Sequence, residues 1–270
     1  MNTTNRFATM GTALAFTLIA ACGQEAPEEA VVEAEVVVAA PMSIYETALA
    51  NESRPAADSK RDAGRKPAEM LEFMGIEPGM AVLDMFSAGG WYAEVIAHVV
   101  GENGHVTAHT NEAYKNFVGE ALEERFAGDR VPNVDIVMAE NNHLSLEENS
   151  LDAVMLAQSF HDLYHVDPDG GWAQIDGPAF LAELKKGLKP GGIVAVIDHT
   201  AMAGAPPETG DSLHRIDPEL VVANMAAAGF TLEASSDLLD NPDDDLTEEV
   251  FGAGIRGKTD RFAMRFRNPD

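Results

Sequence analysis

The sequence predicts an α/β protein built on one doubly wound, mostly parallel sheet of seven strands. From residue 79 onward, short runs rich in valine, isoleucine and leucine alternate with longer amphipathic segments, as parallel strands do with crossover helices. No motif recurs at a fixed period along the chain. A length of 270 residues with 46% hydrophobic content suffices for one well-buried domain, which excludes a fibrous or mainly disordered protein.

Each element of this fold has its own signal in the sequence. Proline and glycine in the Leu188-Lys189-Pro190-Gly191-Gly192 run are typical of the end of a helix. Asp217 and Pro218 are typical of the start of another helix. We expect strands at 80–85, 105–109, 134–138, 151–157, 193–198, 230–234 and 261–266, and helices at 91–100, about 112–126, about 178–188 and 218–229.

The N-terminal 42 residues predict an envelope lipoprotein. Residues 1–21 carry one charged side chain and then an apolar run that is too short to span a bilayer, which is typical of a signal peptide. Cys22 is the only cysteine, and the Ile19-Ala20-Ala21-Cys22 quartet resembles the lipobox of bacterial lipoproteins. We expect lipidation of Cys22, an acidic tether over 22–42, and a place on the periplasmic side of the outer membrane. An ordinary signal peptide with a chance cysteine is the alternative.

Residues 43–78 are predicted to form a helical lid on an α/β domain that spans 79–270. Arg54, Arg61 and Arg65 recur at spacings that place them on one side of a helix. Guanidinium groups so arranged suit a carboxylate-bearing ligand, so the three arginines are candidate substrate-binding residues. Surface ion pairs with neighbouring aspartates are the alternative.

Three sequence features together resemble the class I S-adenosylmethionine-dependent methyltransferases. They are Val82-Leu83-Asp84 before a glycine-containing loop, the Leu151-Asp152-Ala153-Val154 strand and the Leu188–Gly192 turn, in the strand order already described. The resemblance covers roughly residues 68–267. It implies a Rossmann-like sheet, S-adenosylmethionine as cofactor, and a binding crevice beyond the carboxyl ends of the strands.

The resemblance also implies which residues contact the cofactor. The family's D/E-x-G-x-G-x-G loop falls on Asp84, Phe86, Ala88 and Gly90, and only Gly90 keeps its glycine. Phe86 places a phenyl group where the amino acid end of the cofactor normally approaches the chain. At the next two strand ends, Thr110 or Asn111 takes the position of the ribose-binding carboxylate, and Glu140 that of the adenine contact.

The segments after 151–157 and 193–198 supply the candidate catalytic residues, His161 and His199. An imidazole that titrates near neutrality can take a proton from an acceptor that attacks the methyl group. Trp91, Tyr92 and Tyr164 are candidate walls of the substrate site. His161 and His165 form an H-x-x-x-H pattern without the glutamate of zinc proteases, and we expect no metal. A metal site completed by His199 with Asp162 or Asp198 is the alternative.

The predicted function is methyl transfer from S-adenosylmethionine to a small molecule. The formal net charge of −27 argues against nucleic acid as a partner, and contact with a membrane is expected only through the lipid anchor. The departures at Phe86, Ala88 and Thr110 keep two alternatives open. They are a periplasmic lyase, isomerase or hydrolase that uses no cofactor, and a lipoprotein that only binds a small ligand.

Overall fold

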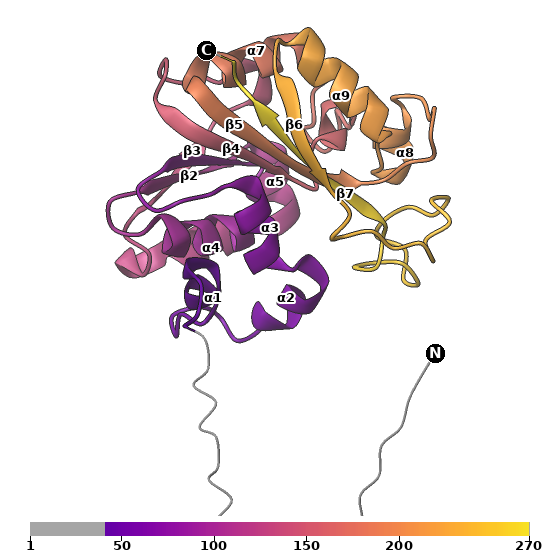
Figure 1. Cartoon of the computed structure of the whole chain (residues 1–270). Helices are drawn as coiled ribbons and strands as arrows, with labels where there is room; N and C mark the ends of the chain where they lie inside the picture. Colours follow the sequence, from indigo (N-terminus) through magenta and orange to yellow (C-terminus); the bar gives the residue numbers. More distant parts are fainter. Residues whose placement is uncertain (1–40, 270) are drawn as a thin grey trace, which may run out of the picture. The chain divides into compact units, whose positions relative to one another are not determined.

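Seven strands form one mixed sheet in the computed structural model, which describes residues 41–269 of the chain. The sheet order is β3-β2-β1-β4-β5-β7-β6, in which β1 to β5 run parallel and β7 is antiparallel to both its neighbours (Figure 1). The doubly wound, mostly parallel sheet predicted from the sequence is confirmed. The strands are β1 Ala81–Met85, β2 His105–Thr110, β3 Val134–Met138, β4 Leu151–Ala157, β5 Leu188–His199, β6 Thr231–Ser236 and β7 Arg261–Arg267.

Helices cover both faces of the sheet (Figure 1). The α-helices are α1 Ile44–Leu49, α2 Ser59–Arg65, α3 Pro67–Met74, α4 Trp91–Val100, α5 Glu112–Val118, α6 Ala121–Phe126, α7 Gly177–Gly187, α8 Thr209–Leu213 and α9 Pro218–Ala227. Three 3₁₀-helices are η1 Ala127–Asp129, η2 Asn141–His143 and η3 His161–Leu163. Within residues 41–269, every helix is too short or too polar to cross a bilayer.

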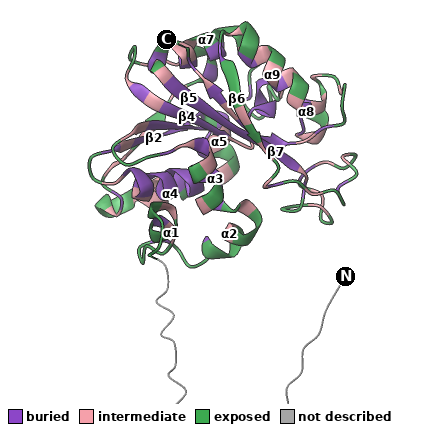
Figure 2. Ribbon diagram, viewed as in Figure 1, coloured by how far each residue is buried: buried purple, intermediate pink, exposed green. Residues whose placement is uncertain are grey.

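Alternate residues of the central strands point to opposite faces and build two separate cores. In β4, Ala153 and Met155 pack with α1, α3 and α4, whereas Val154 and Leu156 pack with α7 and α9. Figure 2 shows the central strands almost wholly buried between these layers. Burial on both faces explains why these strands are continuous apolar runs.

The segment 43–78 contributes to the core more than a lid would. The predicted capping box at Ser43 and Glu46 is present and starts α1. Buried side chains of α1 and α3, namely Ala48, Met70, Leu71 and Met74, pack with α4 against the sheet. Of the three N-terminal helices, only α2 contributes residues to the large crevice described below.

Two elements differ from the sequence prediction, each because of a glycine. The helix expected at about 112–126 is two helices, since Gly119 between them has φ 66°. The run at 188–192 belongs to the start of β5, where Gly191 has φ 76°. The signal peptide 1–21, Cys22 and the tether up to residue 40 lie outside the described residues.

Candidate active site

A crevice of about 1340 Å³ lies at the carboxyl ends of β1, β4 and β5. The sheet order reverses between β1 and β4, and ligands of open α/β sheets bind at such a reversal. The loops after β1, β4 and β5 line the crevice, together with α2 and the segment that leads into β7.

The loop after β1 keeps a backbone suited to glycine although two of its glycines are replaced. Phe86, Ala88 and Gly90 have φ of 54°, 48° and 73°, all in the left-handed region. That conformation costs a residue with a Cβ atom roughly 1–2 kcal/mol. Gly90 cannot be replaced, because a Cβ there would lie 2.8 Å from the Phe126 ring. The loop therefore keeps this conformation at a cost in folding stability, as functional sites often do.

Asp84, at the end of β1, is a buried carboxylate with one unpaired oxygen. The side chain faces the crevice, and its Oδ2 atom has no hydrogen-bond partner among the described residues. Burial raises the pKa of Asp84 to about 7, against the opposing effects of Ser87, the Ala93 amide and the Arg65 charge. A carboxylate held in this way suits a cationic ligand group.

The Phe86 ring lies in an aromatic cluster. Its centroid lies 5.5 Å from Tyr114 and 5.9 Å from Phe180, stacked on both, and 5.8 Å from Trp172. It also meets His109, at the end of β2, edge-on at 5.6 Å. The ring thus lies on the β2 and α5 side of the crevice, where the resemblance places the ribose, and not at the amino acid end as the sequence predicted.

The three predicted contacts to ribose and adenine do not face the crevice. The Asn111 side chain caps α5 by accepting from the Tyr114 amide at 2.7 Å, and its amide group donates to Asn141 at 3.0 Å. Thr110 is buried, and Glu140 accepts a hydrogen bond from the Glu112 amide at 3.3 Å. The Asn111 side chain is thus fully engaged by its neighbours, and none of the three residues lines the crevice in this conformation.

Arg61, Arg65 and Arg261 line the crevice and have no carboxylate partner among residues 41–269. Arg65 donates to the Gln158 side chain at 3.0 Å, and Arg261 to the Gly64 carbonyl at 2.7 Å. Burial lowers the pKa of each of the three guanidinium groups. Such uncompensated positive charge attracts an anionic ligand.

The other predicted substrate-binding residues separate into two groups. Trp91 and Tyr92 line the crevice, and Trp91 lies under Arg54, Arg61 and Arg65 at 5.9, 5.7 and 4.7 Å. Arg61 and Arg65 lie in α2, but Arg54 precedes that helix, so the single helical side predicted for the three arginines is not formed, although all three guanidinium groups lie near the Trp91 ring. Arg54, however, is paired with Asp62 at 2.9 Å and lies outside the crevice, as does Tyr164, which accepts from Asn224.

His161 lies between two aspartates. Its Nδ1 atom is 2.7 Å from Asp198 and its Nε2 atom 3.4 Å from Asp162. Burial alone would lower its pKa, but the two carboxylates outweigh burial and raise the pKa to about 9. His161 is consequently protonated at neutral pH, and the role of free base predicted from the sequence does not suit it in this state.

His199 and His214 are two neutral histidines in the crevice. Burial lowers the pKa of His199 to about 3, and burial together with the His161 charge lowers that of His214 to about 4. His199 Nδ1 lies 2.7 Å from the Thr259 hydroxyl. His214 and Arg261 reach the crevice from α8 and β7, and sequence reasoning missed His214 because nothing near it in the chain marks a strand end. His165 instead contacts Asp211 at 2.9 Å.

Known proteins resemble this chain over its central part. A family model of a methyltransferase domain matches residues 83–196. The ubiquinone/menaquinone biosynthesis C-methyltransferase UbiE of Shewanella piezotolerans is 29% identical over 129 residues, which are 47% of this chain and 46% of that protein. The chain thus matches about half the length of such curated relatives.

Solved structures share the fold at low sequence identity. A SAM-dependent methyltransferase from Aquifex aeolicus superposes with a TM-score of 0.53 at 23% identity, covering 78% of this chain and 97% of that one. The [4+2]-cyclase SpnF gives 0.52 at 17% identity, with 82% and 85% covered. The matched segment contains the loops after β1 and β4 that line the crevice. Residues 83–196 thus match a methyltransferase domain, and the fold of the described chain is that of S-adenosylmethionine-dependent methyltransferases.

Proposed function

We propose that this protein transfers a methyl group from S-adenosylmethionine to a small acceptor that carries a carboxylate. The observation that carries the proposal is the loop after β1, whose backbone keeps the left-handed conformation at Phe86, Ala88 and Gly90 beside the unpaired Asp84. When bound, the cofactor supplies a methyl group on a sulfonium, which is a good leaving group. The protein's own contribution is then mainly alignment of the acceptor.

The crevice fits the amino acid end of this cofactor. Asp84 offers a carboxylate oxygen without a partner to an ammonium group. The nucleoside end fits only after a movement, because the Phe86 ring lies between β1 and α5 in the stack with Tyr114. Displacing that ring is the step that would admit adenosine.

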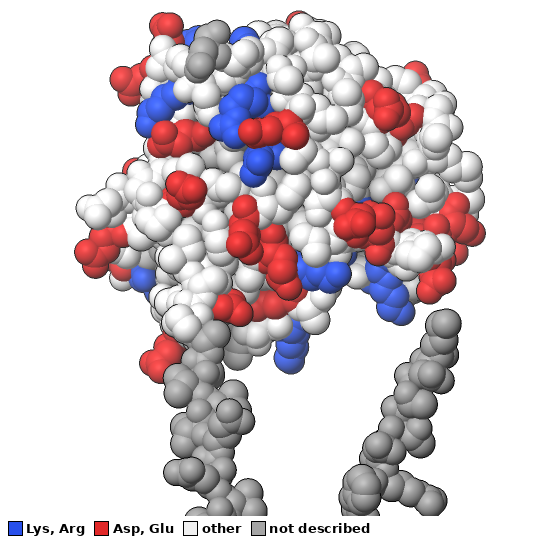
Figure 3. Space-filling model, viewed as in Figure 1, with Lys and Arg blue, Asp and Glu red and all other residues white. Residues whose placement is uncertain are grey.

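The charged groups indicate the class of acceptor. Arg61, Arg65 and Arg261 present guanidinium groups without carboxylate partners, and Arg65 also stacks on Trp91 at 4.7 Å. Guanidinium binds a carboxylate with two parallel hydrogen bonds, which fixes orientation as well as position. Figure 3 shows acidic and basic side chains gathered in several groups on one outer face.

Asp84→Asn tests this function. We expect calorimetry with the purified full chain to show binding of S-adenosylmethionine and of its demethylated product. The substitution should weaken both about 10- to 150-fold, because it removes a hydrogen bond to a charged group worth about 1.5–3 kcal/mol. If neither nucleoside binds the unsubstituted protein at millimolar concentration, the proposal is wrong.

The stability of Asp84→Asn serves as a control, because it should stay equal or rise while ligand binding weakens. The folded-state pKa of Asp84, about 7, lies above its ordinary value of 3.8, so the folded protein holds this proton more tightly than the unfolded chain. This carboxyl therefore reduces the free energy of unfolding as pH rises from about 4 to 7. Asp84→Asn should remove that loss, so weaker binding with equal or higher stability separates a binding role from a folding defect.

We also propose that the protein acts at the cell envelope, held by a lipid on Cys22. The support is the sequence of the first 22 residues. Metabolic labelling with a radioactive fatty acid should mark the full chain in a bacterial host and should not mark Cys22→Ser. Equal labelling of both chains would exclude this anchor.

A second candidate function is catalysis on the same fold without the cofactor. The aromatic cluster around Phe86 favours it, since it fills the nucleoside side of the crevice. One of the solved proteins with this fold is named a cyclase. Failure of both nucleosides to bind would favour this candidate over methyl transfer.

A further inference from the structure

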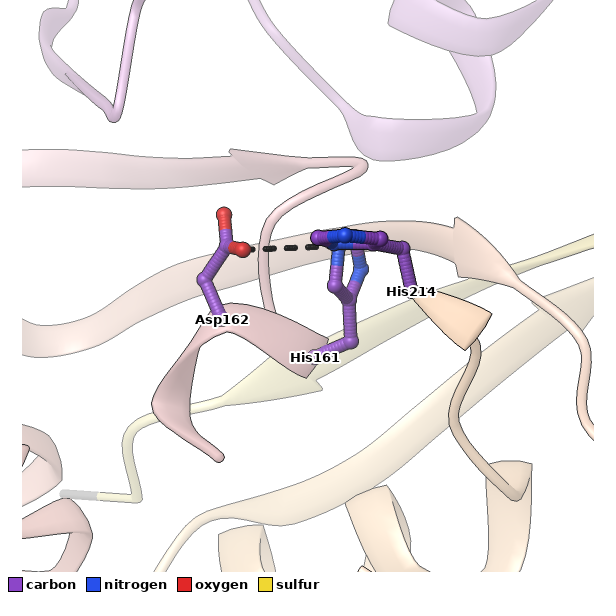
Figure 4. A group of neighbouring side chains, drawn as sticks. All are labelled: His161, Asp162 and His214. Carbon is purple, nitrogen blue, oxygen red and sulfur yellow. Dashed lines mark ion pairs between the residues drawn. The ribbon is translucent and has the colours of Figure 1, made fainter. Parts of the chain in front are cut away.

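Three side chains at one end of the crevice are arranged as a set of metal ligands. His161 and Asp162 come from η3, at the carboxyl end of β4, and His214 caps α8. One ligand atom from each lies within 4.8 Å of the other two. Figure 4 shows the three side chains pointing toward one another from these two segments.

Neighbouring groups hold two of the three residues in a ligating orientation. The Asp198 carboxylate is fully buried and accepts hydrogen bonds from the backbone amides of His161 and His199, both at 2.8 Å. It also accepts a hydrogen bond from Nδ1 of His161. The Nε2 atom is thereby turned toward Asp162. A histidine whose second nitrogen bonds a carboxylate is the usual arrangement at protein metal sites.

Asp162 and His214 complete the arrangement. The Tyr114 hydroxyl donates to Oδ2 of Asp162 at 2.7 Å, which leaves Oδ1 for another ligand. The His214 side chain makes no hydrogen bond within the described residues, and its φ of 53° is a strained conformation for a residue other than glycine. Backbone strain at a side chain without a hydrogen-bond partner indicates a role in binding.

We propose that His161, Asp162 and His214 bind a divalent transition-metal ion such as Zn²⁺. Two imidazoles and one carboxylate suit zinc and the late first-row metals, His161 releasing its proton when the ion binds, and they leave further positions open to the crevice for a ligand oxygen. Zn–N bonds of about 2.0 Å put tetrahedral ligand atoms about 3.3 Å apart, so small rotations of Asp162 and His214 would close the site. The metal site does not depend on S-adenosylmethionine.

The site is tested by titrating Zn²⁺ into the purified full chain with Cys22 alkylated, so that its thiol takes no metal. His214→Gly is the main variant, because glycine suits the backbone at that position and the fold should tolerate it. We expect this variant to lose at least about tenfold in Zn²⁺ affinity, and Asp198→Asn to lose about 10- to 100-fold by releasing the His161 ring.

His143→Ala is the matched control, because this histidine is exposed and lies outside the crevice. The Zn²⁺ affinity of this control should stay within about twofold of that of the unsubstituted chain. Co²⁺ should give visible absorption bands in the control and in the unsubstituted chain, but not in His214→Gly. Absence of Zn²⁺ binding to the unsubstituted chain at tens of micromolar, or equal affinities in His214→Gly and His143→Ala, would overturn the proposal.

Discussion

Replacing Phe86 by glycine should raise the affinity for S-adenosylmethionine about 10- to 150-fold. The phenyl ring is buried against Tyr114, Trp172 and Phe180 on the side of the crevice where the nucleoside would lie. Moving a buried phenylalanine side chain into water costs about 1.5–3 kcal/mol, and in the unsubstituted protein the cofactor must supply it. Glycine removes this cost and restores the residue of the family loop. Calorimetry on both proteins measures the difference.

The stability of Phe86→Gly should fall by less than a typical core truncation. Loss of a buried phenylalanine costs about 3–5 kcal/mol, but release of the left-handed strain at φ 54° returns roughly 1–2 kcal/mol. Phe117→Ala is the control, since Phe117 is an exposed aromatic residue that lines the same crevice. This substitution should change neither the affinity for S-adenosylmethionine nor the free energy of unfolding. An unchanged or lower affinity in a folded Phe86→Gly protein would mean that the ring does not occupy the nucleoside's place.

The sheet could be predicted because its signals are local. The central strands β1 and β4 and residues 193–197 of β5 are buried on both faces, so their sequences are largely apolar runs that periodicity detects. The edge strand β3 is largely exposed, and its valines, isoleucine and methionine identified it instead. The direction of β7 between β5 and β6 was not predictable in the same way, because pairing partners are chosen by contacts distant in sequence. The break at Gly119 was missed for a related reason: glycine lowers helix propensity only modestly, and the tertiary context decides.

The candidate site was predictable where it follows from strand ends. His161 and Asp198 follow β4 and end β5, and the rule that ligands bind beyond such ends brought them together correctly. His214 comes from α8, a five-residue helix without a periodic pattern, so nothing in the sequence joined it to His161. The Phe86 ring fills the side of the crevice next to β2 because of its side-chain rotamer, and a sequence does not specify a rotamer.

Glu94→Ala should reduce the free energy of unfolding by about 3–5 kcal/mol, the expected cost of breaking a buried ion-pair network. The Glu94 side chain is 1% exposed and lies 2.5 Å from both Arg125 and Arg130. Arg125 in turn pairs with Asp58 at 2.6 Å and donates to the Gly89 carbonyl in the loop after β1. Alanine would leave two guanidinium groups without this partner. Urea unfolding followed by circular dichroism measures the loss.

The network also couples stability to the crevice, which makes the prediction more specific. Arg125 connects α6 to the N-terminus of α2 and to the loop that holds Phe86 and Ala88, so Glu94→Ala should weaken ligand binding as well as folding. Glu123→Ala is the control, because its ion pair with Lys115 is solvent-exposed and worth under about 1 kcal/mol. Equal stability losses in the two variants would show that burial of Glu94 adds nothing to its ion pairs. A destabilised Glu94→Ala protein with unchanged affinity would show that the loop keeps its shape without Arg125.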